Sequence, residues 1–266
     1  MKKTSLFAIV AVVVIGFLAI NFSSNLPSFG GESGVYIIET EYGQIKVRLY
    51  DETPKHKESF MKLVKDKVFE NAAFTQNYDN EAMIGGNFSA DGTDRGATIE
   101  KEIVDSLHLK FGALVAYPSE TGEGSSDDKF ILVKGKKYTK DELIQIEKQA
   151  IVANLQRDPE NSAQMAKIEA LAQKHQEDSA RALYDAMINK LKLKADTQYL
   201  AGLGKLFTPE QIDVFTTVGG LPMYEGKMTV FGEVIEGMDV LEKLLKAEAD
   251  RSGVLVKKVP MKIKND

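Results

Sequence analysis

The side chains that most often carry catalysis or bind metals are scarce in this chain of 266 residues. It contains no cysteine, which excludes disulfides, thiolate nucleophiles and cysteine-based zinc sites. Its three histidines, His56, His108 and His175, lie far apart and lack the spacing of metal ligands. No phosphate-binding loop, nucleophile–base pair or pair of catalytic carboxylates is recognisable. The sequence therefore predicts no metal site and no cofactor.

One acidic pair remains as a candidate for ion binding. Asp127 and Asp128 follow a stretch rich in glycine and serine, and we predict that they lie in a loop. There they would bind a cation or, by default, form a solvated acidic turn. The net charge of −5 gives no indication of nucleic-acid binding.

The N-terminus carries the strongest compositional signal. Lys2 and Lys3 precede residues 5–22, an uncharged run of apolar and small residues. The run lies between the apolar core of a cleaved signal peptide, about 7–15 residues, and a membrane span of about 20. Because it lacks a good small-x-small cleavage site, we favour an uncleaved membrane anchor over residues 1–22, with a cleaved signal peptide as the alternative.

This anchor predicts where the rest of the chain lies. The two lysines would stay on the cytoplasmic side, so that the remainder is exported. In a bacterium with an outer membrane, the protein would be anchored in the inner membrane with its bulk in the periplasm. Residues 23–33, which contain serine, glycine and proline, form a predicted linker.

A β pattern follows the linker. Val35–Glu39 and Gln44–Tyr50 flank a turn and predict a β-hairpin, because apolar and polar residues alternate in the second segment. Thr53-Pro54 predicts the start of a helix with Phe60 on its apolar face. Many strands with few helices predict a closed antiparallel β-barrel with a helix over each end. Further strands are predicted over 111–117, 129–133, 228–235 and 254–264, and a second helix over 238–248.

The middle of the chain has a helical pattern. Thr139 and Glu142 form a capping box, Asp158-Pro159 predicts the start of a second helix, and Thr208-Pro209 with Gln211 predicts a third. We interpret an apolar stripe here as the core of a helical hairpin; the alternative is a surface that binds client polypeptide or a partner. The stripe comprises Met165, Ile168, Ala172, Leu183, Met187 and Leu191.

The exported part thus divides into a first barrel segment, 34–135, a helical insertion, 136–207, and a second barrel segment, 208–266. Three motifs lie in the barrel segments. Val35–Pro54 contains an apolar-E-T-x-x-G-x-I turn followed by Thr-Pro, Phe74–Asn87 ends in a double glycine, and Tyr224–Val234 reads Y-E-G-K-M-T-V-F-G-E-V. These segments resemble the cyclophilin family of peptidyl-prolyl isomerases, whose last motif is L-D-G-K-H-T-V-F-G-x-V.

The resemblance implies a mainly β, cyclophilin-like barrel. Some bacterial members carry a helical insertion after a segment similar to Val133–Thr139. His108, in L-H-L-K-F-G, stands in a stretch similar to the family's L-x-H-x-R-x-G, and we interpret it as a structural residue.

The resemblance also implies a reaction, rotation about the X-Pro bond, whose barrier is about 18–20 kcal/mol. The family's enzymes hold the proline ring in an apolar pocket and direct an arginine at the prolyl amide. In this chain Gln76 occupies the position of that arginine. Glu81-Ala82 replaces the Phe-Met pair of the pocket floor, which would put a charge where the ring packs.

The other groove positions are replaced as well. Met223 and Met228 stand at the family's tryptophan and histidine, and Tyr117-Pro118 at its clamping asparagine. Ile84 and Lys129 stand at two glutamines, and a register shifted by one residue is the alternative for Lys129 and the neighbouring Ile131. The predicted substrate groove therefore comprises Gln76, Ile84, Lys129, Ile131, Met223 and Met228, with no residue assigned as catalytic.

These replacements predict a membrane-anchored periplasmic protein with weak or no isomerase activity. It would bind extended polypeptide or act as a scaffold within an envelope or membrane complex. One alternative is an active isomerase that assists the folding of exported proteins, with Lys129 contributing a positive charge. The other is an export chaperone that binds clients through the helical insertion.

Overall fold

A computed structural model describes residues 34–88, 96–119 and 121–266. The predicted anchor, 1–22, and the predicted linker, 23–33, lie outside these residues. Within the described part, no helix has both the length and the apolar character that crossing a membrane requires.

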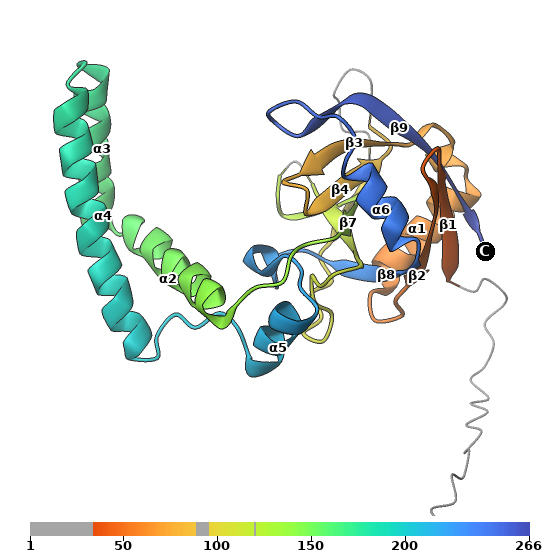
Figure 1. The fold of residues 1–266 in the computed structure, drawn as a ribbon, viewed down its shortest axis with the longest axis horizontal. Helices are drawn as coiled ribbons and strands as arrows, with labels where there is room; N and C mark the ends of the chain where they lie inside the picture. Colours follow the sequence, from red (N-terminus) through yellow and green to blue (C-terminus); the bar gives the residue numbers. More distant parts are fainter. Residues whose placement is uncertain (1–33, 89–95, 120) are drawn as a thin grey trace, which may run out of the picture. The chain divides into compact units, whose positions relative to one another are not determined.

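Eight of the described strands close into an antiparallel barrel (Figure 1). Their order is β4-β3-β9-β1-β2-β8-β6-β7, and β7 pairs back with β4, so that no strand of the ring has a free edge. The short strand β5 pairs with the first residues of β7, beyond the end of β4. The predicted mainly β, closed barrel is confirmed. The strands are β1 Val35–Thr40, β2 Gly43–Leu49, β3 Ala73–Tyr78, β4 Ala82–Gly86, β5 Thr98–Glu100, β6 Ala113–Pro118, β7 Gly124–Val133, β8 Val230–Glu236 and β9 Val254–Asn265.

The barrel core is aromatic. The Phe60 ring, from helix α1 (Pro54–Lys65), lies within 5.3–6.2 Å of the rings of Tyr36, Phe69, Phe130 and Phe231, which come from separate parts of the chain. Such offset and edge-to-face ring pairs add to the stabilisation that burial provides.

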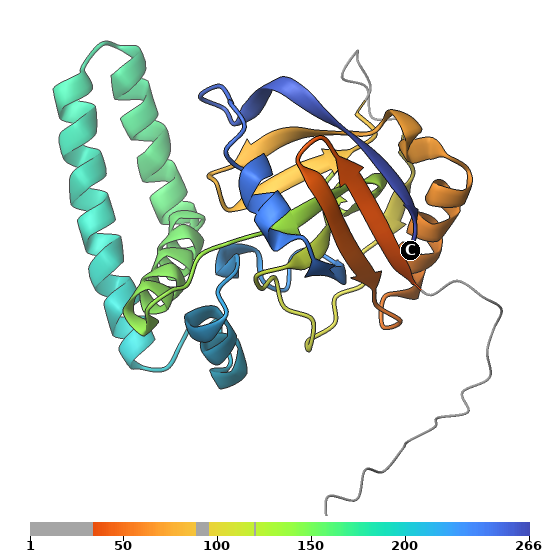
Figure 2. The same ribbon diagram turned by 45° about the vertical axis from the view of Figure 1, so that its right-hand side comes forward.

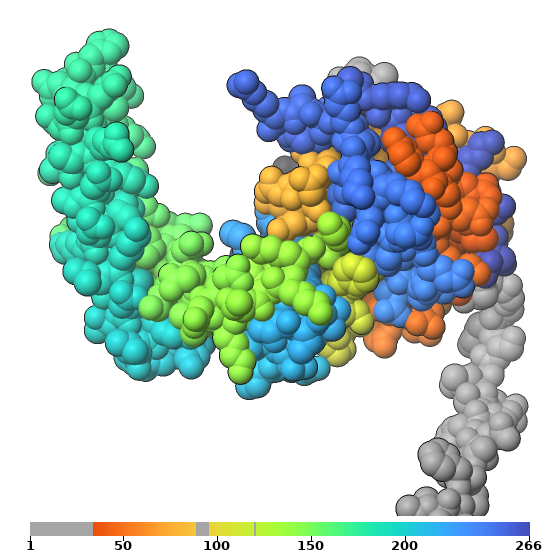
Figure 3. Space-filling view, viewed as in Figure 1, coloured from red at the N-terminus to blue at the C-terminus, as the bar shows by residue number. Residues whose placement is uncertain are grey.

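A second helix, α6 (Met238–Leu244), packs on the barrel beside β2 and buries Leu241 and Leu244 against the same core (Figure 2). It ends earlier than the predicted boundary at residue 248. In the space-filling view, α6, the β1–β2 hairpin and β9 lie side by side on one face (Figure 3). Two 3₁₀ turns, η1 (Val68–Asn71) and η2 (Pro222–Tyr224), complete the barrel part.

Three helices follow β7, namely α2 (Lys140–Gln156), α3 (Pro159–Gln173) and α4 (Glu177–Leu200). Helices α3 and α4 pack mainly on each other and on α2. Both predicted capping boxes are present, at Thr139 for α2 and at Thr208 for α5, which spans Pro209–Thr217.

The apolar stripe of these helices is only partly buried. Ile168, Met187 and Leu191 form a buried cluster with Ala180, as expected for the core of a helical hairpin. Leu183 is 42% exposed and Ala172 is exposed, so the prediction that they belong to this core is wrong. Leu171 and Leu155 pack against the cluster. Which apolar residues of the stripe are buried depends on where the helices cross, and their spacing in the sequence does not determine it.

The helical segment is fastened where it leaves and rejoins the barrel. A small apolar cluster of Leu143, Phe207 and Phe215 joins α2 to α5. The backbone N–H of Tyr138 donates to the carbonyl of Phe215 at 3.0 Å. Gly220 bridges to Lys136 with a φ of +151°, and a Cβ there would collide with the Leu109 carbonyl. This close approach requires glycine.

Candidate peptide-binding groove

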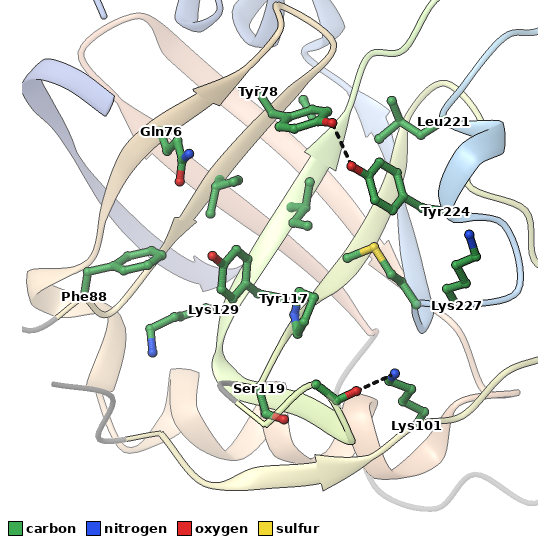
Figure 4. A pocket seen from close by; sticks show the side chains of 16 residues that line it. Gln76, Tyr78, Phe88, Lys101, Tyr117, Ser119, Lys129, Leu221, Tyr224 and Lys227 are labelled. Carbon is green, nitrogen blue, oxygen red and sulfur yellow. Dashed lines mark hydrogen bonds between the residues drawn. The ribbon is translucent and has the colours of Figure 1, made fainter. Parts of the chain in front are cut away.

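A cavity of about 760 Å³ opens on the barrel beside β3, β4, β7 and η2 (Figure 4). Its floor is apolar, since Ala82, Ile84, Ile131 and Leu221 are all buried and line it. Polar side chains stand around this floor. They are Gln76, Tyr78, Lys101, Tyr117, Ser119, Lys129, Tyr224 and Lys227.

Strand register produces the floor. In the antiparallel pairs, Ile84 lies opposite both Gln76 on β3 and Ile131 on β7. Side chains directly opposite each other in a sheet project from the same face. Ile84 and Ile131 also belong to a second apolar cluster, which includes Val115 and Val133 and is separate from the aromatic core. The floor is therefore held by a packed layer, and it is preformed.

At the position expected to hold the family's arginine, Gln76 contacts a neighbouring turn. Its Nε2 donates a long hydrogen bond, 3.4 Å, to the carbonyl of Ser252. A neutral amide donates more weakly than a guanidinium and carries no charge. The described residues that line the cavity include no arginine.

Three lysines line the cavity, and each interacts with the protein. Nζ of Lys101 donates to the carbonyl of Gly122 at 2.8 Å, and Nζ of Lys227 donates to the carbonyl of Met223 at 2.8 Å. Lys129 is 6% exposed; its Nζ lies 3.7 Å from a carboxylate oxygen of Asp128 and 5.3 Å from the centroid of the Phe88 ring. These contacts hold the charges at the edge of the cavity.

Two tyrosines that the sequence analysis did not single out meet beside the floor. The hydroxyl oxygens of Tyr78 and Tyr224 lie 2.7 Å apart, and the rings are edge-to-face at 6.0 Å (Figure 4). The hydrogen bond with Tyr224, together with burial, raises the pKa of Tyr78 to about 12. The signal in the sequence was their place within two of the motif segments, Phe74–Asn87 and Tyr224–Val234.

Five of the six predicted groove residues line this cavity: Gln76, Ile84, Lys129, Ile131 and Met228. Met223 does not. It is 53% exposed and lines a second cavity of about 380 Å³ on the other side of the tyrosine pair.

Glu81 also lines the second cavity, so the expectation that its charge lies on the apolar floor is wrong. The turn between β3 and β4 separates it from its neighbour: Ala82 is the first residue of β4 and points into the floor.

The acidic pair lies in a strand rather than in the predicted loop. Asp127 and Asp128 belong to β7, and Asp128 is 3% exposed and accepts a hydrogen bond from the Ser126 hydroxyl at 2.9 Å. In the described part of the chain, no group of three or more acidic or histidine side chains is arranged to hold a metal ion.

His108 fastens the groove from outside. Its Nδ1 lies 2.6 Å from the Glu225 carboxylate, which also accepts hydrogen bonds from the backbone N–H of Leu109 and from Nε2 of Gln211. Glu225 directly follows Tyr224, so these bonds hold the turn after η2 against α5 and the residues before β6. The arrangement fits the structural role expected for His108.

Comparisons with known proteins agree with this geometry. The family described as cyclophilin type peptidyl-prolyl cis-trans isomerase/CLD matches residues 35–265. Two solved structures of a cyclophilin type peptidyl-prolyl cis-trans isomerase from Cryptosporidium parvum, one in the presence of the dipeptide Ala-Pro, each share 15% identity with a TM-score of 0.51. They cover 87% and 88% of this chain, and 98% and 97% of their own lengths. No curated protein sequence matches the chain. The chain belongs to the cyclophilin-type peptidyl-prolyl cis-trans isomerase family.

Proposed function

We propose that this protein binds proline-containing segments of extended polypeptide in the 760 Å³ cavity and catalyses their isomerisation weakly or not at all. The apolar floor of Ala82, Ile84, Ile131 and Leu221 suits a proline ring, which has no polar atom to satisfy. One similar structure was determined in the presence of Ala-Pro, a dipeptide that contains such a ring.

The observation that carries the proposal of weak activity is the amide at residue 76. Rotation about the prolyl bond is accelerated when a donor stabilises the twisted amide more than the planar one. Gln76 offers only a neutral amide, whose Nε2 donates a hydrogen bond to the carbonyl of Ser252, while the three lysines of the cavity interact at its edge.

An active isomerase is the second candidate, because the cavity and its apolar floor are both present without the arginine. A dry cleft lowers the barrier modestly by desolvating the amide. An assay of prolyl isomerisation on a peptide substrate, with the purified protein, separates the two. A rate near the uncatalysed one, from a folded sample that still binds the peptide, supports a binding protein. Acceleration near that of ordinary cyclophilins would establish an enzyme instead.

The proposed site of action is the periplasmic face of the inner membrane. The uncharged run over residues 5–22, preceded by Lys2 and Lys3, supports an uncleaved anchor there. Such a position suits a protein that meets exported polypeptides or docks on an envelope complex. Cell fractionation tests this: recovery of the protein in the soluble periplasmic fraction would rule out the anchored form.

A further inference from the structure

We propose that the second cavity, between α2 and the β3–β4 turn, is a subsite that takes a lysine or arginine side chain of the same polypeptide whose proline occupies the main cavity. This inference rests on the proposed function, since it assigns a substrate preference to that groove. It also gives the helical segment a part in binding, because α2 supplies one wall.

The two cavities are neighbours. Tyr78, Leu221 and Tyr224 line both of them, so the tyrosine pair is a partition with the apolar floor on one side and the second cavity on the other. The second cavity has a volume of about 380 Å³, enough for one long side chain. A polypeptide that crosses the pair would place its proline and a nearby residue in separate cavities.

The charge of the second cavity is negative. Of the four ionisable side chains other than tyrosine that line it, Lys136 lies 3.6 Å from the Glu142 carboxylate, and the two charges compensate each other. This leaves Asp79 and Glu81. No described residue donates a hydrogen bond to the Glu81 carboxylate. Burial and the charge of Asp79 raise the pKa of this half-buried group and outweigh the opposing charges of Lys136 and Lys134. A carboxylate in this environment gains from a cationic partner.

The phenol of Tyr138, which also lines the second cavity, is subject to the charges of these carboxylates. Burial and the charges of Glu81 and Glu142 raise the pKa of Tyr138 to about 12. Nζ of Lys136 lies 4.8 Å from the centroid of the Tyr138 ring, so this wall carries one cation beside the carboxylates.

The remaining lining fits the stem of a lysine or arginine. Ile146 on α2 and the half-exposed Met223 on η2 provide apolar surface beside the carboxylates. Long basic side chains pack their methylene groups on such surface and keep the charged end at a polar group. Methionine adapts its shape to either side chain.

The wall is held in place before any ligand binds. The backbone N–H groups of Lys134 and Gly135 donate to the carbonyl of Glu81 at 2.8 Å and 2.7 Å. These bonds tie the β3–β4 turn to the segment that leads into α2. A preformed pocket avoids the entropic cost of ordering its own residues on binding.

The test is a set of fluorescent peptides with a central Ala-Pro and a single variable residue moved through the flanking positions on both sides. At each position, lysine is compared with norleucine, which has a similar stem and no charge. At one position lysine should bind roughly tenfold more tightly than norleucine, the effect of one charge-assisted hydrogen bond. In the Glu81→Gln and Asp79→Asn variants this ratio should fall toward one. Glu58→Gln, on the exposed side of α1, is the matched control and should keep it.

Each other outcome is informative. Tight binding of all the proline peptides with no lysine preference at any position would overturn the subsite and leave the proposed function intact. A lysine preference that survives in both variants would also overturn it. Failure of every proline peptide to bind a folded sample would remove the proposed function and this inference together.

Discussion

The hydroxyl of Tyr78, at the end of β3, lies 2.7 Å from the hydroxyl of Tyr224, 146 residues later in η2. The bond joins β3, the strand that carries Gln76, to η2 across the side of the candidate groove. It fixes the partition between the two cavities, and it makes the titration of Tyr78 a measure of the groove's integrity.

Replacing Tyr224 by Phe removes this bond and should lower the pKa of Tyr78 from about 12 toward its ordinary value of 10.0. A phenol whose pKa is raised by folding stabilises the protein fully below the unfolded value and loses that contribution as pH rises through the folded value. The folding stability of the unaltered protein should therefore fall between about pH 10 and pH 12, and that of Tyr224→Phe should fall less. Absorbance titration and thermal melts at those pH values measure both effects.

The control for this prediction is Tyr42→Phe, which removes an exposed phenol in the first hairpin. It should leave the raised pKa of Tyr78 unchanged. An unchanged high-pH titration in Tyr224→Phe would contradict the assigned cause.

Replacing Gln76 by Arg puts a guanidinium at the edge of the apolar floor. Because a charged donor forms a stronger hydrogen bond to the localised lone pair of the twisted prolyl nitrogen than a neutral amide does, the rate of prolyl isomerisation should rise by roughly one to two orders of magnitude. A protease-coupled or NMR exchange assay measures it. Gln173→Arg, at the exposed end of α3, adds the same charge far from the floor and should have no effect. Equal rates for both variants would mean that the groove is not competent in other respects.

Glu102 fastens the start of helix α1. Its carboxylate accepts hydrogen bonds from the backbone N–H groups of Lys55 and His56, and it lies 2.6 Å from Nδ1 of His56, which is 3% exposed. Burial raises the pKa of Glu102, but these hydrogen bonds outweigh it, and the pKa lies below the ordinary 4.5. Burial lowers the pKa of His56 below its ordinary 6.5, so the pair is a neutral imidazole and an ionised carboxylate.

Glu102→Gln should therefore cost about 1–2 kcal/mol of folding free energy near pH 7, the loss of a helix cap and a charge-assisted bond. A carboxyl group whose pKa is lowered by folding stabilises the protein above its unfolded pKa and loses this contribution as the pH falls through its folded pKa. The unaltered protein should therefore lose stability below pH 4.5. The variant should lose less. Urea unfolding from pH 3 to pH 7 measures this. The exposed Glu58 on α1 is the control, and Glu58→Gln should leave the loss of stability at low pH unchanged.

Met187 is 2% exposed at the centre of the helical cluster, whereas Leu193 on the same helix is 70% exposed. Met187→Ala should cost about 2–4 kcal/mol by leaving a cavity, and Leu193→Ala should change stability by less than about 0.5 kcal/mol. Urea unfolding of both variants measures the difference. A similar cost for both would contradict the packing of α4 against α3.

The sequence by itself determined several of the barrel strands and the starts of α1, α2, α3 and α5, but not the start of α4 at Glu177. Alternation over Gln44–Tyr50 specified a half-buried strand, and the capping boxes at Thr139 and Thr208 specified where α2 and α5 begin. These signals succeed because they depend on residues close in the chain, whose period or local hydrogen bonds decide the structure. The motif at Tyr224–Val234 likewise indicated the family, which the match over residues 35–265 shows.

Only the tertiary structure decided which side chains share a cavity. Glu81 and Ala82 are adjacent in the chain, yet a turn sends one to the second cavity and the other to the apolar floor. Tyr78 meets Tyr224 only because strand closure brings β3 beside η2. The helical insertion becomes a wall of the second cavity because backbone bonds to the Glu81 carbonyl hold the two residues just before it, Lys134 and Gly135, in place. The contacts between side chains and turns depend on register and closure over separations from 53 residues (Glu81 to Lys134) to 146 residues (Tyr78 to Tyr224), which no local pattern encodes.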